Sequence, residues 1–161
     1  MGERRSLRVG VAWAGSASHF NDSNRSIALS RFASLFSVPN VEFVTLQKEL
    51  GPGDADILGQ CRNVTALGQE LTDFADTAAL ISLLDLVIAV DTSVVHLAGA
   101  IGRPFWVLIP FAPDFRWLLE RDDTPWYPGA RLFRQPGVDA WESVLARVRM
   151  ELARLADRHR T

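Results

Sequence analysis

With 161 residues, 48% hydrophobic and 22% charged, the chain has the length and composition of one ordinary globular domain. Its formal net charge of −2 argues against a nucleic-acid partner, because proteins that bind nucleic acid normally carry an excess of basic residues. The single cysteine excludes an internal disulfide, and we expect no membrane span because no apolar run approaches the roughly 20 residues that one requires.

Residues 1–8 are polar and basic and contain no apolar segment of the kind that a secretion signal needs. We therefore expect residues 1–6 to be a disordered or artificially introduced start and residues 7–158 to form a single domain. Because the lone cysteine, Cys61, is compatible with a reducing compartment, we expect a cytoplasmic location.

The first predicted strand, Leu7 to Trp13, runs into a long polar loop, Ala14 to Ser26. Long loops in small domains tend to be functional or disordered. Gly15 and Ser16 would let the backbone approach a ligand closely, and Arg25 offers a planar set of donors suited to a diphosphate. The alternative is a solvated surface loop, and the loop residues taken alone favour it.

A short helix is predicted from Arg31 to about Phe36, with Ser30 as its N-cap, and the second strand from Val41 to Leu46. Gln47 and Lys48 follow at the carboxyl end of that strand. They are candidates for contact with a nucleotide, and the alternative is a polar entrance to the next loop.

A helix is expected from Asp54 to Cys61. Asp54 and Asp56 match the Asp-x-Asp pattern of metal-dependent sugar transferases, but acids at a helix start also interact favourably with the helix dipole. We interpret these two residues as helix-capping, and we expect no bound metal.

A weak third strand, Val64 to Leu67, is followed by a helix that reaches Leu84. Either Asp76 or Thr77 is the expected cap of this helix. Its amino end should lie at the same edge of the sheet as the loop that begins at Ala14.

The central segment begins with the apolar run Leu86 to Val90, which is typical of a strand buried on both faces. Asp91, Thr92 and Ser93 follow where a helix would start. The first N–H groups of a helix lack internal partners and carry a partial positive charge, and ligands of open α/β sheets bind at the carboxyl ends of strands. We therefore predict a phosphate site at this turn, the alternative being an ordinary helix cap.

His96 falls on roughly the same side of the predicted helix as Thr92 and Ser93, within an otherwise apolar stretch. A buried core histidine and a histidine directed at the Asp91 turn are both compatible with this position, and we favour the second.

A fifth strand is predicted from Pro104 to Ile109, and a sixth from Ala130 to Arg134. Two aromatic loops, 110–117 and 125–129, surround them. Their rings either stack on a base or sugar or pack on the core. Asp139 is the expected cap of the last helix, which runs to about Arg158.

Strands thus alternate with helices throughout the chain. Right-handed crossovers then give an α/β fold, a three-layer Rossmann-like parallel sheet with helices on both faces. The turns that follow Trp13, Leu46 and Val90 should meet at one edge of this sheet.

The segment Asp91-Thr92-Ser93-x-x-His96, continued by Leu97-Ala98-Gly99-Ala100 and Pro104, resembles the signature of glycosyltransferase family 9, the ADP-heptose:lipopolysaccharide heptosyltransferases. The chain is more similar still to the family-9-like domain that follows tetratricopeptide repeats in many bacterial proteins. That second resemblance also uses Val11 to Gly15, Asn21 to Ser26, Pro113 to Trp117 and Pro125 to Pro128, and it covers residues 7–158.

The resemblance implies the carboxyl-terminal, donor-binding half of a GT-B enzyme, which uses no bound metal. It implies that Thr92 and Ser93 hold the donor diphosphate, that Asp91 contacts the donor sugar, and that His96 supports the turn or reaches the phosphate. Arg25 would stand where heptosyltransferases carry a phosphate-binding Lys. Gln47 and Lys48 would line the nucleoside pocket. Independently of the resemblance, the loop after the first strand leads us to expect that Gly15 and Ser16 contact the same ligand.

The implied function is donor binding for hexosyl or heptosyl transfer, with a nucleoside-diphosphate sugar as substrate. In this family the general base and the acceptor site lie mostly in an amino-terminal domain, so we expect no transfer by this chain alone and a partner acceptor or tetratricopeptide-repeat domain in the full-length protein. Two rivals remain open: a non-catalytic interaction domain that keeps the fold but not the ligand site, and another nucleotide-sugar enzyme such as an epimerase.

Overall fold

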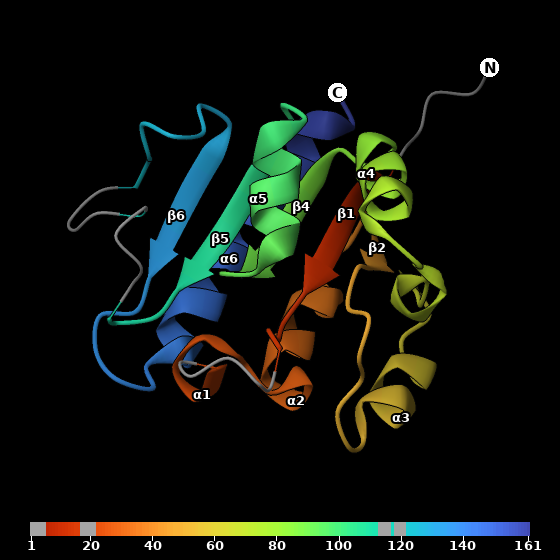
Figure 1. Ribbon diagram of the computed structural model, residues 1–161, viewed down its shortest axis with the longest axis horizontal. Helices are drawn as coiled ribbons and strands as arrows, with labels where there is room; N and C mark the ends of the chain where they lie inside the picture. Colours follow the sequence, from red (N-terminus) through yellow and green to blue (C-terminus); the bar gives the residue numbers. More distant parts are fainter. Residues whose placement is uncertain (1–5, 17–21, 113–116, 118–121) are drawn as a thin grey trace.

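The computed structural model describes residues 6–16, 22–112, 117 and 122–161. Six strands form one sheet, in the order β3-β2-β1-β4-β5-β6, and every neighbouring pair is parallel (Figure 1). The strands are β1 Leu7–Ala12, β2 Val41–Thr45, β3 Val64–Thr65, β4 Leu86–Val90, β5 Phe105–Ile109 and β6 Ala130–Arg134. The predicted parallel α/β sheet is confirmed, with strand ends that differ from prediction by at most two residues.

Helices cover both faces of the sheet. The α-helices are α1 Asp22–Arg25, α2 Leu29–Phe32, α3 Asp54–Gly59, α4 Phe74–Ser82, α5 Ser93–Ala100 and α6 Trp141–His159. Two short 3-10 helices, η1 Ala33–Ser37 and η2 Gly68–Glu70, complete the described elements. In Figure 1, α4 and α5 lie in front of the sheet and α6 lies behind it.

The side chains of the sheet divide between two cores because successive residues of a strand point to opposite faces. In β4, Leu86, Ile88 and Val90 pack with α2, η1 and α6, whereas Val87 and Ala89 pack with α4 and α5. All five residues of β4 are buried. The sequence run is apolar throughout because both faces of the strand are covered, as predicted.

The strand order places a reversal between β1 and β4, since the chain winds outward in opposite directions from these two neighbours. At such a point the loops leaving the two strands diverge and open a crevice at their carboxyl ends. The loop that begins at Trp13 and the turn that begins at Asp91 leave these strands.

Several predicted helix caps are wrong, either because the helix begins at another residue or because the side chain has another partner. Helix α2 begins at Leu29, so Ser30 lies inside it. Helix α4 is capped by Asp73, whose carboxylate accepts the N–H of Asp76, while the Asp76 carboxylate accepts from the backbone and hydroxyl of Thr72.

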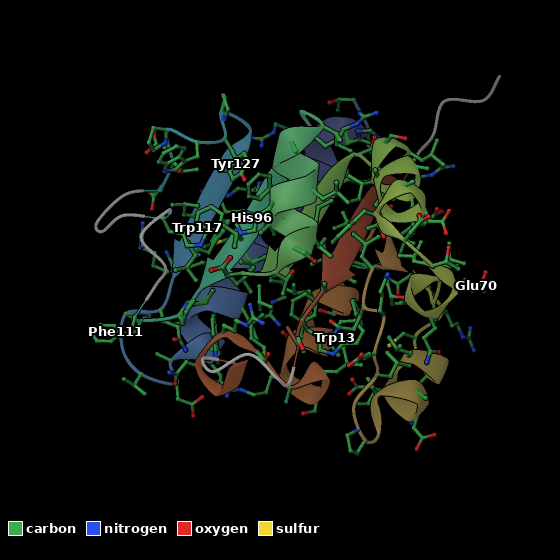
Figure 2. All side chains as sticks on the ribbon, viewed as in Figure 1. Trp13, Glu70, His96, Phe111, Trp117 and Tyr127 are labelled. Carbon is green, nitrogen blue, oxygen red and sulfur yellow. The ribbon has the colours of Figure 1, made fainter. Side chains whose placement is uncertain are left out.

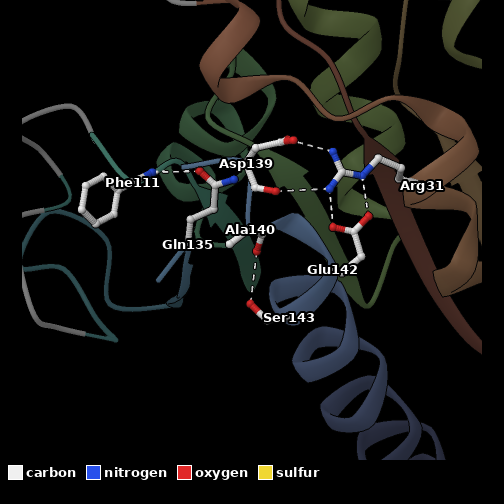
Figure 3. Close-up of polar contacts among 7 residues, drawn as sticks. All are labelled: Arg31, Phe111, Gln135, Asp139, Ala140, Glu142 and Ser143. Atoms are coloured by element: carbon white, nitrogen blue, oxygen red, sulfur yellow. Dashed lines mark hydrogen bonds and ion pairs between the residues drawn. The ribbon is translucent and has the colours of Figure 1, made fainter. Parts of the chain in front are cut away.

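The predicted cap of the last helix, Asp139, is also wrong. The N-cap of this helix is Ala140, and Asp139 precedes it in a left-handed conformation with φ of 56°. The Asp139 carboxylate and the Glu142 carboxylate both accept from the Arg31 guanidinium, at 2.9 Å from Nη1 and 2.7 Å from Nε respectively (Figure 3). Arg31 thus ties α2 to the start of α6 instead of leaving Asp139 free to cap it.

Asp54 does not cap α3 with its side chain either. Gly53 occupies the N-cap position, and the buried Asp54 carboxylate accepts the N–H of Gly51 at 2.9 Å and the indole N–H of Trp13 at 3.2 Å. Asp54 therefore anchors the end of the first strand segment. In the described part of the chain, no helix is both long and apolar enough to cross a membrane.

Candidate functional site

A cavity of about 390 Å³ lies at the carboxyl ends of β1, β2 and β4, and we call it the strand-end cavity. Its walls come from the loops after β1 and β2, from α1, and from the amino ends of α4 and α5. It is lined by Ala12, Ala14, Gly15, Ser16, Arg25, Leu46, Gln47, Lys48, Glu49, Phe74, Thr77, Thr92, Ser93, Val94 and Leu97. The structure thus brings together all the predicted site residues except Asp91 and His96.

Arg25, at the end of α1, reaches the turn that follows β4. Its Nη1 donates to the backbone carbonyl of Asp91 at 2.9 Å. The guanidinium lies directly against Gly15, where a Cβ atom would overlap it. Gly15 is itself held to the α1 side of the loop, since its N–H donates to the Ser26 hydroxyl at 3.0 Å. The sequence could not predict this approach, because Arg25 and Asp91 are 66 residues apart in the chain.

Helix α5 presents its amino end to the cavity. Thr92 is the N-cap residue in extended conformation, and the first bond of the helix runs from the Val95 N–H to the Thr92 carbonyl at 3.2 Å. The N–H groups of Ser93 and Val94 precede that bond. The Thr92 side chain does not cap the helix, and its buried hydroxyl has no hydrogen-bond partner among the described residues. Both features leave donors beside the cavity.

Gln47 is buried and committed to the backbone, not open to a nucleoside. Its Oε1 accepts the N–H groups of Trp13 and Ala14, both at 3.0 Å, and its Nε2 donates to the Ala14 carbonyl at 3.1 Å. Gln47 therefore holds the loop after β1 against the loop after β2. Lys48, the next residue, is exposed at the cavity wall beside Glu49, so it is the member of the predicted pair that remains accessible.

One side of the cavity is apolar. Leu46, Val94 and Leu97 contribute aliphatic surface, and Phe74, at the first position of α4, is 66% exposed. Thr77 lies one turn further along α4 and is buried. None of these apolar residues was among the predicted site residues. The sequence signal that could have marked Phe74 is an aromatic residue among the polar residues Thr72, Asp73, Asp76 and Thr77 at the start of a predicted helix.

His96 is on α5 but does not line the cavity. Its Nε2 lies 3.3 Å from Oδ1 of Asp91, and its Nδ1 lies 3.1 Å from the hydroxyl of Tyr127. The prediction that His96 is directed at the Asp91 turn matches this geometry, whereas direct contact with a phosphate in the cavity does not.

Asp91 is mostly buried, with 16% of its side chain exposed. Burial is the largest single influence on its pKa and acts to raise it. The donors of His96 and the nearby indole of Trp117, together with the charges of His96 and Arg25, outweigh burial and hold the pKa of Asp91 below its ordinary value. Asp91 is therefore ionised at neutral pH.

Trp117 and Tyr127 of the two aromatic loops pack on the core, the second of the two interpretations that the sequence left open, whereas Phe111 and Trp126 of these loops are exposed. Trp117 is fully buried and stacks on the His96 ring, with centroids 5.5 Å apart and planes at 22°. Tyr127 packs edge-on against Phe105 with centroids 5.6 Å apart. Figure 2 shows His96, Trp117 and Tyr127 grouped beside α5. Residues 113–116 of the first loop lie outside the described residues.

Within the described ranges, no three or more His, Cys, Asp or Glu side chains are grouped so as to hold a metal ion. The expectation of a metal-independent site stays a prediction.

Similarity to a known protein family covers the segment that contains the Asp91 turn and α5. Residues 55–108 match the model of glycosyltransferase family 9 (heptosyltransferase). The matched segment contains β4, the Asp91 turn and α5. The protein FlbA of Caulobacter vibrioides is 28% identical over 155 residues, which is 88% of this chain and 24% of FlbA. The chain therefore spans about a quarter of this curated relative.

Two solved structures share the fold. The E. coli heptosyltransferase WaaC, solved with ADP, superposes with a TM-score of 0.62 at 14% identity, and a family 9 glycosyl transferase from Veillonella parvula with a TM-score of 0.60 at 16% identity. Each match covers 96% of this chain and 46% of the solved chain. The chain thus has the fold of a little less than half of each of these proteins.

Proposed function

We propose that this chain is the donor-binding domain of a metal-independent GT-B glycosyltransferase of family 9, and that it takes a nucleoside-diphosphate sugar. The observation that carries the proposal is the strand-end cavity, in which the open amino end of α5, the guanidinium of Arg25 and the ammonium of Lys48 face the same space. The family-model match over residues 55–108 supports it.

The proposed diphosphate site lies between α5 and Arg25. The N–H groups at the start of α5 supply partial positive charge, and a guanidinium offers paired donors in a plane that suits two phosphate oxygens. Thr92 and Ser93 would supply further donors. In transfer, negative charge grows on the departing diphosphate, so donors fixed before the reaction stabilise the transition state more than the bound ground state.

The proposed nucleoside site is the apolar side of the same cavity. Phe74 offers an exposed ring on which a base can stack, and Leu46, Val94 and Leu97 offer aliphatic contacts. Lys48 and Glu49 lie at the wall where ribose hydroxyls or base edges would find polar partners. The sequence-based assignment of Gln47 to direct nucleoside contact is replaced here by a role in shaping the wall.

We infer that the acceptor site and the general base lie on another part of the full-length protein. This chain has the fold of 46% of the solved heptosyltransferase, so we infer that transfer needs a further acceptor domain. The sequence-based expectation of an amino-terminal acceptor or tetratricopeptide-repeat domain, in a bacterial cytoplasm, stays part of this proposal.

The rival interpretation as a non-catalytic interaction domain predicts a filled turn at Asp91 and no open space at the strand ends. The strand-end cavity lies at that position, with Thr92 and Ser93 in its wall, and therefore favours the ligand-binding interpretation.

The test is titration calorimetry of the chain with ADP, UDP and GDP. We expect saturable binding of at least one nucleotide, and we expect Arg25→Ala to weaken it at least tenfold. The matched control is Arg62→Ala, since Arg62 is exposed at the opposite edge of the sheet. The proposal fails if none of the three nucleotides binds at millimolar concentration, or if the two arginine variants bind equally.

A further inference from the structure

Four residues form a hydrogen-bond chain that connects the turn before β6 with the strand-end cavity. The Tyr127 hydroxyl contacts Nδ1 of His96 at 3.1 Å, and Nε2 of His96 contacts Oδ1 of Asp91 at 3.3 Å. The Asp91 carbonyl then accepts from Nη1 of Arg25 at 2.9 Å. Of these residues, Arg25 lines the cavity and Tyr127 does not. Tyr127 is therefore the far end of the chain.

The chemistry of the chain fixes the direction of its hydrogen bonds. An ionised carboxylate only accepts, so Nε2 of His96 must carry a proton toward Asp91. When the imidazole is neutral, Nδ1 is then an acceptor, and the Tyr127 hydroxyl donates to it. A tyrosine at position 127 thus matches the tautomer that Asp91 requires, and phenylalanine there would leave Nδ1 without a donor among the described residues.

Tyr127 is itself held rigidly in place. Its carbonyl accepts the Ala130 N–H at 3.1 Å, which ties the turn to the start of β6. Its ring packs against Phe105 and Trp117, with centroids 5.6 Å and 6.4 Å away. On its other side the ring lies so close to Gly99 of α5 that a Cβ atom there would overlap it. Gly99, one helical turn after His96, therefore allows the phenol to reach the imidazole.

We propose that Tyr127 is a positioning residue for the donor site: it holds His96 in one tautomer and orientation, and through His96 and Asp91 it fixes where Arg25 meets the diphosphate. The last part of this inference rests on the proposed function. Because Asp91 is bonded at its side chain by His96 and at its carbonyl by Arg25, a change in the imidazole moves the peptide unit against which the guanidinium is set.

The first test needs no ligand. Tyr127→Phe keeps the ring and its packing and removes only the hydroxyl. The imidazole nitrogens of His96 are observed by 15N-detected NMR at about pH 8, where an ordinary histidine is neutral. The chain has three histidines, so His19→Gln and His159→Gln variants suffice for assignment. In the wild type we expect a protonated Nε2 and a hydrogen-bonded Nδ1. In Tyr127→Phe we expect Nδ1 to move toward the frequency of an unbonded nitrogen, and the Arg25 side-chain resonance to shift with it.

The second test measures ADP binding by calorimetry. We expect Tyr127→Phe to raise the Kd for ADP about threefold to tenfold, the range that loss of one hydrogen bond produces, with a melting temperature within a few degrees of the wild type. The matched control is Trp126→Phe, because Trp126 is the neighbouring aromatic residue and is 61% exposed. This control should bind ADP like the wild type.

Three outcomes separate the possibilities. Unchanged His96 and Arg25 resonances in Tyr127→Phe would overturn the positioning role, whatever the ADP result. Shifted resonances with unchanged ADP affinity would show that the hydrogen-bond chain exists but does not position the donor site, which also overturns the proposal. Failure of the wild type to bind ADP, UDP or GDP would overturn the proposed function and with it the link from Tyr127 to the donor site.

A second variant tests the same geometry from helix α5. Gly99→Ala leaves the Tyr127 hydroxyl in place but pushes the ring away from α5. If Tyr127 positions His96, this variant should shift the same Nδ1 resonance in the same direction. A wild-type Nδ1 resonance in folded Gly99→Ala would contradict the proposed geometry.

Discussion

The Cα atom of Gly15 lies against the guanidinium of Arg25, so that a Cβ atom at position 15 would overlap Nη2, Cζ and Nε at once. The same guanidinium is bonded to the Asp91 carbonyl. Arg25 is therefore held between two backbone segments, one leaving β1 and the other leaving β4. This arrangement makes the absence of a side chain at position 15 a condition for the proposed diphosphate site.

Gly15→Ala should consequently act like a partial loss of Arg25. The methyl group displaces the guanidinium from the Asp91 carbonyl, so we expect the Kd for ADP in calorimetry to rise at least fivefold. The control is Gly59→Ala in α3, because a Cβ atom at Gly59 meets nothing within 4 Å. Equal ADP affinity in the two alanine variants would show that Arg25 does not need its place against Gly15.

Gln47 and Lys48 are neighbours with different expected roles. Gln47→Ala removes three hydrogen bonds to the backbone of residues 13 and 14, and we expect it to lower the free energy of unfolding by about 2 to 4 kcal/mol in a urea titration. Lys48→Ala should change that free energy by less than about 0.5 kcal/mol, because Lys48 is exposed.

Lys48→Ala, which should affect stability less than Gln47→Ala, should have a clear effect on ADP binding. Lys48→Ala is expected to weaken ADP binding about threefold to tenfold, since it removes a cation from the cavity wall. If Lys48→Ala binds ADP like the wild type, Lys48 is a solvated surface residue that does not contact the bound nucleotide.

The pKa of Asp91 links stability to pH. Because this pKa is lower in the folded chain than in the unfolded one, ionised Asp91 stabilises the fold above about pH 4, the ordinary value for an aspartate. That contribution is lost as the pH falls through the folded pKa. The difference in unfolding free energy between the wild type and Asp91→Asn should therefore shrink as the pH falls below about 4.

Urea titrations at several pH values check this expectation, and Asp56→Asn serves as the control for the simple loss of one exposed negative charge. A difference between wild type and Asp91→Asn that stays constant down to pH 3 would contradict the assigned influence of His96 and Arg25 on Asp91.

The fold was predictable because its signals are local. The apolar run at Leu86 to Val90 and the alternation of strands with helices determine a parallel sheet once crossovers are right-handed. The helix caps were predicted less well. Three aspartates with side chains suited to capping form other hydrogen bonds instead: Asp54 accepts from Trp13, Asp76 from Thr72, and Asp139 from Arg31. Tertiary packing brings at least Trp13 and Arg31 to these aspartates from distant parts of the chain.

The same limit applies to the site. A sequence places Thr92, Ser93 and Gln47 at strand ends, and strand ends of a parallel sheet must share an edge. It does not say which way a side chain turns there. The Gln47 side chain points toward the backbone of residues 13 and 14, where it forms hydrogen bonds. The His96 side chain points toward the hydroxyl of Tyr127, 31 residues later in the chain. Side-chain pairs that are this far apart in the chain produce no recognisable spacing pattern in the sequence.

Arg25→Lys provides a graded test of the diphosphate site. Lysine keeps one positive charge but offers a single ammonium in place of a planar fork, so it cannot bind the Asp91 carbonyl and two phosphate oxygens in the arginine's geometry. We expect ADP affinity to fall about threefold to tenfold, which is less than in Arg25→Ala. Because the charge is kept, the salt dependence of binding should stay close to that of the wild type in Arg25→Lys and should weaken in Arg25→Ala. Should Arg25→Lys and Arg25→Ala lose affinity equally, the guanidinium would act through its hydrogen bond to Asp91 and not through its charge on the ligand.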